Sequence, residues 1–132
     1  MFGSIFNRKK LFTDTKLLGR WGERRCEKFL RRKGLRTLAR NYACNAGEID
    51  LVMVDSDRSI VFVEVKTRTD EEFAPAEAVI TRPKMDRITK TARYFISTCE
   101  IENRPYRFDI VTVTVGLRGP EEIRHYKNAF VR

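Results

Sequence analysis

The sequence predicts a mixed α/β fold in which helices pack against one central sheet. Three observations carry this prediction. Alternating Val and Ile residues indicate strands in the middle and towards the end of the chain, apolar stripes at helical spacing lie before and between them, and turn residues separate the segments. A length of 132 residues suits one domain with one core.

The N-terminal third predicts a basic lead-in followed by a helix. Residues 1–12 are expected to be flexible, so that the domain proper spans residues 13–132. The sequence "TDT" at 13–15 supplies capping side chains, and Gly34 stops the helix near Lys33. Its apolar face comprises Leu17, Leu18, Trp21, Gly22, Cys26, Phe29 and Leu30.

The middle of the chain predicts a short strand at 35–42 and then an antiparallel hairpin. Its two strands, 48–55 and 60–67, are joined by a loop at 56–58. Alternation sends neighbouring side chains to opposite faces. One face of the first hairpin strand is expected to carry Glu48, Asp50, Val52 and Val54, and the other Ile49, Leu51, Met53 and Asp55.

The last part predicts a second helix and one or two further strands. A short helical turn is expected at 77–80, and the long helix starts near Thr81 with Pro83 in its first turn. Its buried stripe comprises Met85, Ile88, Ala92 and Phe95. A strand follows at 106–115, and a final strand or edge segment at 123–130.

The composition favours a polyanionic partner. Lys and Arg number 27 against 18 Asp and Glu, which leaves a net charge of +9. The same charge could simply serve as a solvated surface. Three scattered cysteines suggest neither a disulfide framework nor a zinc ribbon. The sequence has no signal-peptide pattern and no apolar run long enough to span a bilayer, so we expect a cytoplasmic protein without membrane partners.

The hairpin carries acids where strands usually carry valine. If Asp55 faces Ser59 across the turn, then Asp50 lies opposite Glu64 and Glu48 lies opposite Lys66. Two carboxylates about 4 Å apart repel by roughly 4 kcal/mol at an effective dielectric near 20. A shared proton, a compensating cation such as Lys66, or a bound divalent ion could offset this. A cluster of oxygen ligands without histidine favours Mg²⁺ or Mn²⁺ over zinc.

These residues resemble a known nuclease signature. Asp50, thirteen residues and then Glu64-Val65-Lys66 match the D…ExK pattern of restriction-endonuclease-like nucleases. In chain order, "GEIDL", "FVEVKTR", "AEAV", "RFDIV" and "NAF" resemble the YraN family of small bacterial proteins, which look like Holliday-junction resolvases. The resemblance runs from about Leu18 to Phe130. It implies a restriction-endonuclease-like core whose motif strands form the hairpin.

The resemblance also implies roles for particular residues. Asp50, Glu64 and Glu23 of the first helix would bind the metal and act in catalysis, with Lys66 as the catalytic lysine. Glu48 would contact the metal-binding residues without binding the metal itself. The expected nucleic-acid contacts are Lys84, Arg87 and Arg68. The chain departs from the family pattern in the loop "YACNAG", which lacks basic residues, and at Ala74, where glycine is expected.

The predicted function is phosphodiester hydrolysis in nucleic acid, with DNA favoured, by an endonuclease that uses one or two Mg²⁺ or Mn²⁺ ions. Resolvase-like activity would further suggest a homodimer. One alternative is a non-catalytic nucleic-acid-binding partner in repair or recombination. Another is an interaction module whose acids only stabilise the hairpin.

Several other residues have simpler interpretations. Glu23 could merely pair with Arg20 or Lys16 along its helix. Asp109 is expected to be a structural or capping acid, and His125 an edge residue rather than a general base. The aromatic residues expected in the core are Trp21, Phe29, Phe95 and Phe108.

Overall fold

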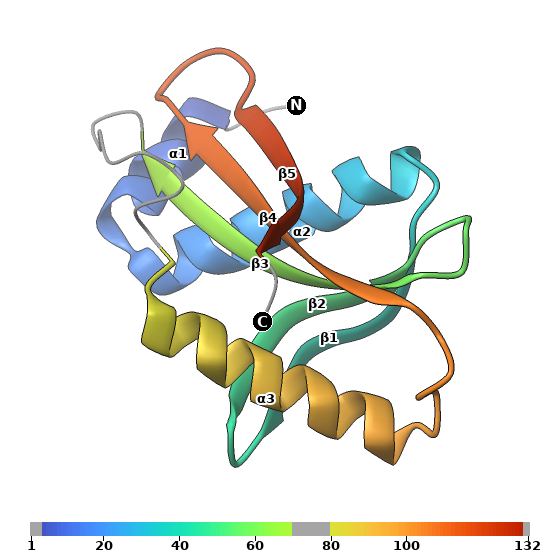
Figure 1. Cartoon of the computed structure of the whole chain (residues 1–132). Coiled ribbons are helices and arrows are strands. Elements are labelled where there is room, and N and C mark those ends of the chain that lie inside the picture. The colour runs from blue at the N-terminus through green and yellow to red at the C-terminus, as the bar shows by residue number, and fades with distance from the viewer. Residues whose placement is uncertain (1–3, 70–79, 131–132) are drawn as a thin grey trace.

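A computed structural model describes residues 4–69 and 80–130 of the chain. Five strands form one sheet in the order β1-β2-β3-β4-β5, in which β3 and β4 are parallel and the other neighbours are antiparallel (Figure 1). The elements are α1 (Ser4–Thr13), α2 (Thr15–Arg32), β1 (Arg36–Cys44), β2 (Gly47–Val54), β3 (Ile60–Thr69), α3 (Arg82–Thr98), β4 (Tyr106–Val115) and β5 (Glu122–Phe130). The predicted mixed α/β fold, with an antiparallel motif hairpin flanked by helices, is confirmed.

The two long helices cover opposite faces of the sheet (Figure 1). On the α2 face, apolar side chains pack into a core that includes Cys26, Leu30, Leu51, Val63 and Val111. On the α3 face, a second core includes Val52, Phe62, Ile88, Phe95 and Phe108. None of the described helices is long and apolar enough to cross a membrane.

Helix α2 begins and ends as predicted. Asp14 caps it by accepting a hydrogen bond from the Leu17 N–H at 3.1 Å, and Gly34 follows its end with φ of +100°. At Gly22 the helix comes so close to β3 that an added Cβ would lie 1.7 Å from the Thr67 hydroxyl oxygen. The glycine therefore sets the closest approach of α2 to the strand that carries Glu64.

The N-terminal segment corrects one prediction. Residues expected in a flexible lead-in form α1, whose Leu11 is only 5% exposed and packs with Leu18 and Val115. Leu11 anchors this segment, with Phe12 packed beside it and Arg8 paired with Glu121 at 3.8 Å. The prediction gave most weight to the three basic residues Arg8, Lys9 and Lys10, although six of residues 1–12 are hydrophobic.

Helix α3 also starts where the sequence indicates. The Thr81 hydroxyl caps it by accepting from the Lys84 N–H at 3.3 Å, and Pro83 stands in the first turn. Ile88, Ala92 and Phe95 of the predicted stripe are buried, and Met85 packs against them partly exposed. Most of the helical turn predicted at 77–80 lies outside the described residues.

The motif hairpin has the predicted register but ends earlier than predicted. Leu51 pairs with Val63 and Val54 with Ile60, so counting across the turn at Asp55 and Ser59 gives the correct pairs. Pairing between β2 and β3 stops at Leu51, and Asp50 and Glu48 lie beyond it.

The strict alternation of faces along β2 was wrong. Ile49 packs with Val52 and Val54 on the α3 face, whereas Leu51 and Met53 pack on the α2 face. The change of face coincides with the end of the β2–β3 pairing. The strands therefore separate at the residues that carry the candidate chemistry.

Candidate functional site

Asp50 lies where β2 leaves β3. Its Oδ2 accepts a hydrogen bond from the Val65 N–H at 2.8 Å. A side-chain oxygen thus replaces the backbone partner that β3 lacks beyond Val63. This contact explains why a short acceptor side chain suits the position, whatever else it does.

The charge of Asp50 is strongly disfavoured. Burial, followed by the negative charge of Glu64, raises the pKa of Asp50 to about 8. The charge of Glu23 adds to this rise, while the Val65 N–H and the ammonium of Lys84 oppose it. The two predicted metal-binding acids of the hairpin are therefore close enough to interact, and α2 contributes a third.

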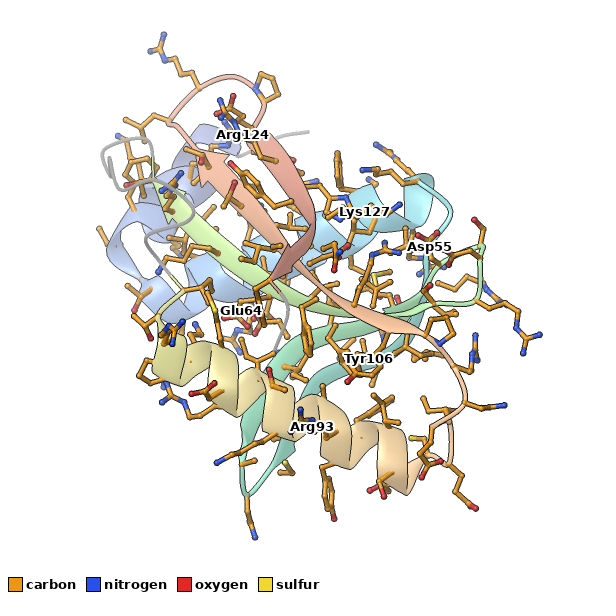
Figure 2. All side chains as sticks on the ribbon, in the orientation of Figure 1. Asp55, Glu64, Arg93, Tyr106, Arg124 and Lys127 are labelled. Atoms are coloured by element: carbon orange, nitrogen blue, oxygen red, sulfur yellow. The ribbon has the colours of Figure 1, made fainter. Side chains whose placement is uncertain are left out.

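The cation that partly neutralises this cluster comes from α3. Lys84 Nζ lies 2.6 Å from Glu64 Oε2, and the Glu64 side chain is almost fully buried. Figure 2 shows Glu64 beside the N-terminal part of α3. Lys66, which the sequence offered as one possible compensating cation, makes no ion pair with any described residue, whereas Lys84 contacts Glu64 directly.

Glu23 points from α2 towards β1. Its Oε1 accepts a hydrogen bond from Asn41 Nδ2 at 2.9 Å. Asn41 has φ of +48°, a conformation that asparagine tolerates better than most residues. Glu23 makes no ion pair with Lys16 or Arg20 among the described residues, and it is near enough to Asp50 to raise the pKa of that acid.

Glu48 and Lys66 do not face each other as predicted. Glu48 is exposed and pairs with Ala43 of β1, while Lys66 pairs with Thr112 of β4. The predicted cluster of four polar groups is thus only half assembled, because the hairpin separates before it reaches them. Lys66 follows Glu64 by two residues in β3, so both side chains leave the strand on the same face.

The predicted nucleic-acid contacts lie on two elements. Arg87 is exposed on α3 beside Gly47, and Arg68 is partly buried opposite Thr114 of β4. Lys84 is 39% exposed while paired with Glu64. Their contacts with nucleic acid stay predictions.

The acids fit a cation only in part. Asp50 and Glu64 are oxygen donors whose repulsion a divalent ion would relieve. As the side chains stand, however, no group of three or more His, Cys, Asp and Glu residues in the described part of the chain is placed to hold a metal ion. Lys84 lies against Glu64, and Glu23 is bound to Asn41. Coordination by all three acids would require these two contacts to change.

Two buried groups near the site were not singled out from the sequence. Burial, and then the charges of Asp50, Glu27 and Glu23, raise the pKa of the Cys26 thiol, which favours its protonated form. Glu27 is 9% exposed and accepts from Thr37 Oγ1 at 2.6 Å and Arg40 Nε at 2.9 Å. Although burial opposes it, these bonds lower the pKa of Glu27. The sequence feature that could have identified Glu27 as buried is its position next to Cys26 on the apolar face of the helix.

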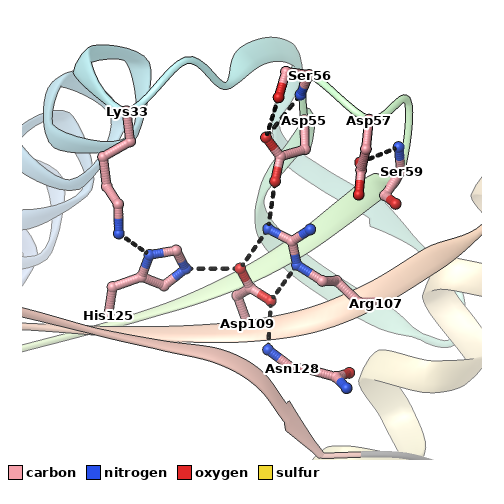
Figure 3. A network of polar contacts seen from close by, with 9 residues as sticks. All are labelled: Lys33, Asp55, Ser56, Asp57, Ser59, Arg107, Asp109, His125 and Asn128. Atoms are coloured by element: carbon pink, nitrogen blue, oxygen red, sulfur yellow. Dashed lines mark hydrogen bonds and ion pairs between the residues drawn. The ribbon is translucent and has the colours of Figure 1, made fainter.

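A second buried acid belongs to a separate network, drawn in Figure 3. Asp109 is fully buried and accepts bonds from Arg107 Nε at 3.0 Å, His125 Nε2 at 2.7 Å and the Asn128 N–H at 2.9 Å. Lys33 Nζ lies 2.8 Å from His125 Nδ1. The prediction of a structural role for Asp109 is confirmed, and His125 is held by it on edge strand β5.

Comparison with known proteins identifies close sequence relatives. A family model described as "Uncharacterised protein family UPF0102" matches residues 22–113. A UPF0102 protein of Pelotomaculum thermopropionicum is 40% identical over 116 residues, which cover 87% of this chain and 96% of the relative. A UPF0102 protein of Nitrosomonas eutropha is 39% identical over 118 residues, covering 89% and 97%.

Two solved structures show more distant similarity. A repair endonuclease from Pyrococcus abyssi aligns with a TM-score of 0.32 and 19% identity, over 59% of this chain and 29% of that one. The Pyrococcus furiosus protein SfsA, solved in complex with Ca²⁺, aligns with a TM-score of 0.39 and 17% identity, over 86% and 64% of the two chains.

Proposed function

This chain belongs to the uncharacterised protein family UPF0102, the YraN family that its motifs resemble, and from that premise we propose that it is a metal-dependent endonuclease. Its substrate is nucleic acid, with DNA preferred, and its reaction is phosphodiester hydrolysis. One observation carries the proposal. Asp50 lies close to the buried Glu64, and burial followed by the negative charge of Glu64 raises the pKa of Asp50 to about 8.

The chemistry assigns separate tasks to these residues. Asp50 and Glu64 would hold Mg²⁺ or Mn²⁺, which when bound supplies positive charge to a phosphate oxygen and acidifies a water molecule. Lys66, on the same face of β3 as Glu64, would orient that water or accept its proton. Glu23 would complete the acids from α2 after release from Asn41, and Lys84 would exchange Glu64 for a phosphate oxygen.

A second candidate is a non-catalytic nucleic-acid-binding protein of the same fold. The contact between Lys84 Nζ and Glu64 Oε2 favours it, because an ammonium at 2.6 Å already neutralises one of the two acids. In that case Asp50 serves only to accept the Val65 N–H, and the basic surface binds nucleic acid without cleaving it.

Cleavage assays on defined substrates test the first proposal. Single-stranded, duplex, flap and four-way-junction DNA, with matched RNA, would be incubated with Mg²⁺ or Mn²⁺ and the wild-type protein. We expect Asp50→Asn and Glu64→Gln to reduce cleavage at least 100-fold, because each removes a metal-binding charge. Glu102→Gln, at an exposed acid in the turn before β4, is the matched control and should keep full activity.

Metal binding separates the two candidates. Calorimetric titration with Mn²⁺ should give an affinity for the wild type that both amide variants lose. Equal cleavage by wild type and Glu64→Gln would mark the activity as a contaminant and overturn the endonuclease proposal. DNA binding that persists in the amide variants, without cleavage or Mn²⁺ binding by the wild type, would support the second candidate instead.

A further inference from the structure

A basic groove lies along the outer side of α2. It has a volume of about 420 Å³ and is lined by Arg24, Glu27, Lys28, Arg31 and Arg32. The four cationic side chains are exposed, and within the described part of the chain none of them forms an ion pair. Four positive charges without an ion pair to any described residue are therefore gathered over one short stretch of helix, although Arg31 lies near enough to Glu27 to help lower the pKa of that acid.

Two neighbouring cations have partners within the protein. Arg25 of α2 pairs with Glu121 at 3.7 Å, and Lys33, which caps the end of the helix, contacts His125 at 2.8 Å. In the groove, by contrast, Arg24 and Lys28 stand four residues apart, a spacing at which like charges repel and destabilise a helix. The repulsion would be relieved by an external anion.

Glu27 does not supply that anion. Its two oxygens are occupied by Thr37 and by Arg40, whose Nη2 lies 2.8 Å from Oε2. This pair fixes the Arg40 side chain from β1 beside the groove. Glu27 thus places a fifth cation, Arg40, beside the groove, and the net charge of the groove remains positive.

The groove continues the line of the candidate acid site. Glu23 and Glu27 are four residues apart on one side of α2, so the acid in the groove lies about one turn, or roughly 5.4 Å, along the helix from the acid that interacts with Asp50. From Arg24 to Arg32 the helix rises about 12 Å. Successive phosphates of one DNA strand advance about 3.4 Å along the duplex axis, so the row spans about three of them.

We propose that this α2 groove binds the phosphate backbone of duplex DNA and directs one strand to the acid cluster. The inference rests on the proposed function for its choice of DNA as the polyanion. It assigns the main phosphate contacts to α2, beside the contacts predicted for Lys84, Arg87 and Arg68.

The salt dependence of DNA binding tests this assignment. Fluorescence anisotropy with a duplex of arbitrary sequence, in EDTA to prevent cleavage, would compare wild type with Arg24→Gln/Lys28→Gln/Arg31→Gln. Loss of three phosphate contacts should reduce the slope of log K against log salt by about 2.7. Raising salt from 50 to 200 mM would then weaken wild-type binding about 40-fold more than that of the variant. The matched control is Lys90→Gln/Arg93→Gln/Arg118→Gln, which removes three exposed cations elsewhere and should change the slope by less than 1.

A charge-preserving variant guards against misfolding. Arg24→Lys/Arg31→Lys should keep the wild-type slope, because counterion release depends on charge. Equal slopes for the glutamine variant and its control would overturn the groove assignment, as would absence of DNA binding by the wild type at low salt. So would binding to anionic lipid vesicles without binding to DNA. Groove-dependent binding without any cleavage would refute the endonuclease proposal alone, whereas metal-dependent cleavage with unaltered binding by the groove variant would refute this inference alone.

Discussion

Asp50 in β2 and Asp109 in β4 are both carried by strands of the central sheet, and burial disfavours the charged form of each. The results are opposite. The pKa of Asp50 rises to about 8, whereas hydrogen bonds from His125, Arg107 and the Asn128 N–H outweigh burial and lower the pKa of Asp109. The direction of the shift is therefore decided by the groups that meet the carboxylate.

The neighbours of the two acids explain the difference. Asp109 meets a guanidinium, an imidazole and a backbone N–H (Figure 3). Asp50 meets one backbone N–H and the charges of two further acids, and Lys84 bonds to Glu64 instead. The hydrogen-bond partners of Asp109 offset its charge, and it serves as a structural anchor. Asp50 accepts no bond from a cationic side chain among the described residues, and a bound cation would supply the missing partner.

The Asp109 network also joins distant parts of the chain. Arg107 Nη2 reaches Asp55 Oδ2 at 3.0 Å at the β2–β3 turn, and Lys33 brings in the end of α2 through His125 (Figure 3). Figure 2 shows Asp55 well away from Glu64. Asp50 and Asp109 therefore lie in separate regions of the molecule, and a substitution in one region should leave the other unaffected.

The largest expected effect comes from removing the structural acid. Asp109→Asn should lower the free energy of unfolding by about 3 to 5 kcal/mol, because it leaves the buried Arg107 guanidinium with only Asp55 as a charged partner. Asp50→Asn should leave stability unchanged or raise it in the absence of metal, since its amide oxygen can still accept the Val65 N–H. Urea denaturation at pH 8 in EDTA measures both. A loss of several kcal/mol in Asp50→Asn would make Asp50 a structural acid like Asp109.

Much of this fold follows from local patterns in the sequence. The caps at Asp14 and Thr81 and the turn between Asp55 and Ser59 depend on neighbouring residues, so helix starts and the hairpin register were predictable. Helix α1 was missed because its stability depends on Leu11 meeting Val115, a contact across the whole chain.

The candidate site was less predictable because it also depends on contacts between residues that are far apart in the sequence. The pattern brought Asp50 and Glu64 together correctly, but the end of strand pairing at Leu51 is not encoded in an alternating pattern. Nor does the sequence indicate that Lys84, twenty residues beyond Glu64 and on another element, would be its partner. Charge compensation across elements depends on tertiary packing, which spacing along the chain does not specify.

Stability should depend on pH in opposite senses for the two acids. The folded-state pKa of Asp50, about 8, exceeds its ordinary value of 3.8, so its contribution is complete below about pH 4 and is lost as pH rises towards 8. The slope should approach about 1.4 kcal/mol per pH unit in EDTA and flatten in Asp50→Asn. The pKa of Asp109 is lowered, so its contribution is lost as pH falls below about 4. Denaturation from about pH 2 to about pH 9 tests both contributions. Parallel curves for wild type and Asp50→Asn would contradict it.

The smallest expected effects separate the causes that act on Asp50. Glu64→Gln removes a negative charge and should lower the pKa of Asp50, whereas Lys84→Met removes a positive charge and should raise it. Lys84→Met should cost at most about 1 kcal/mol of stability, because the lysine is partly exposed. Carbon-13 NMR titration of the Asp50 carboxyl measures both shifts, with Glu102→Gln as control. If neither variant moves the titration, the charges of Glu64 and Lys84 do not shift the pKa of Asp50, and the case that these neighbours call for a cation fails.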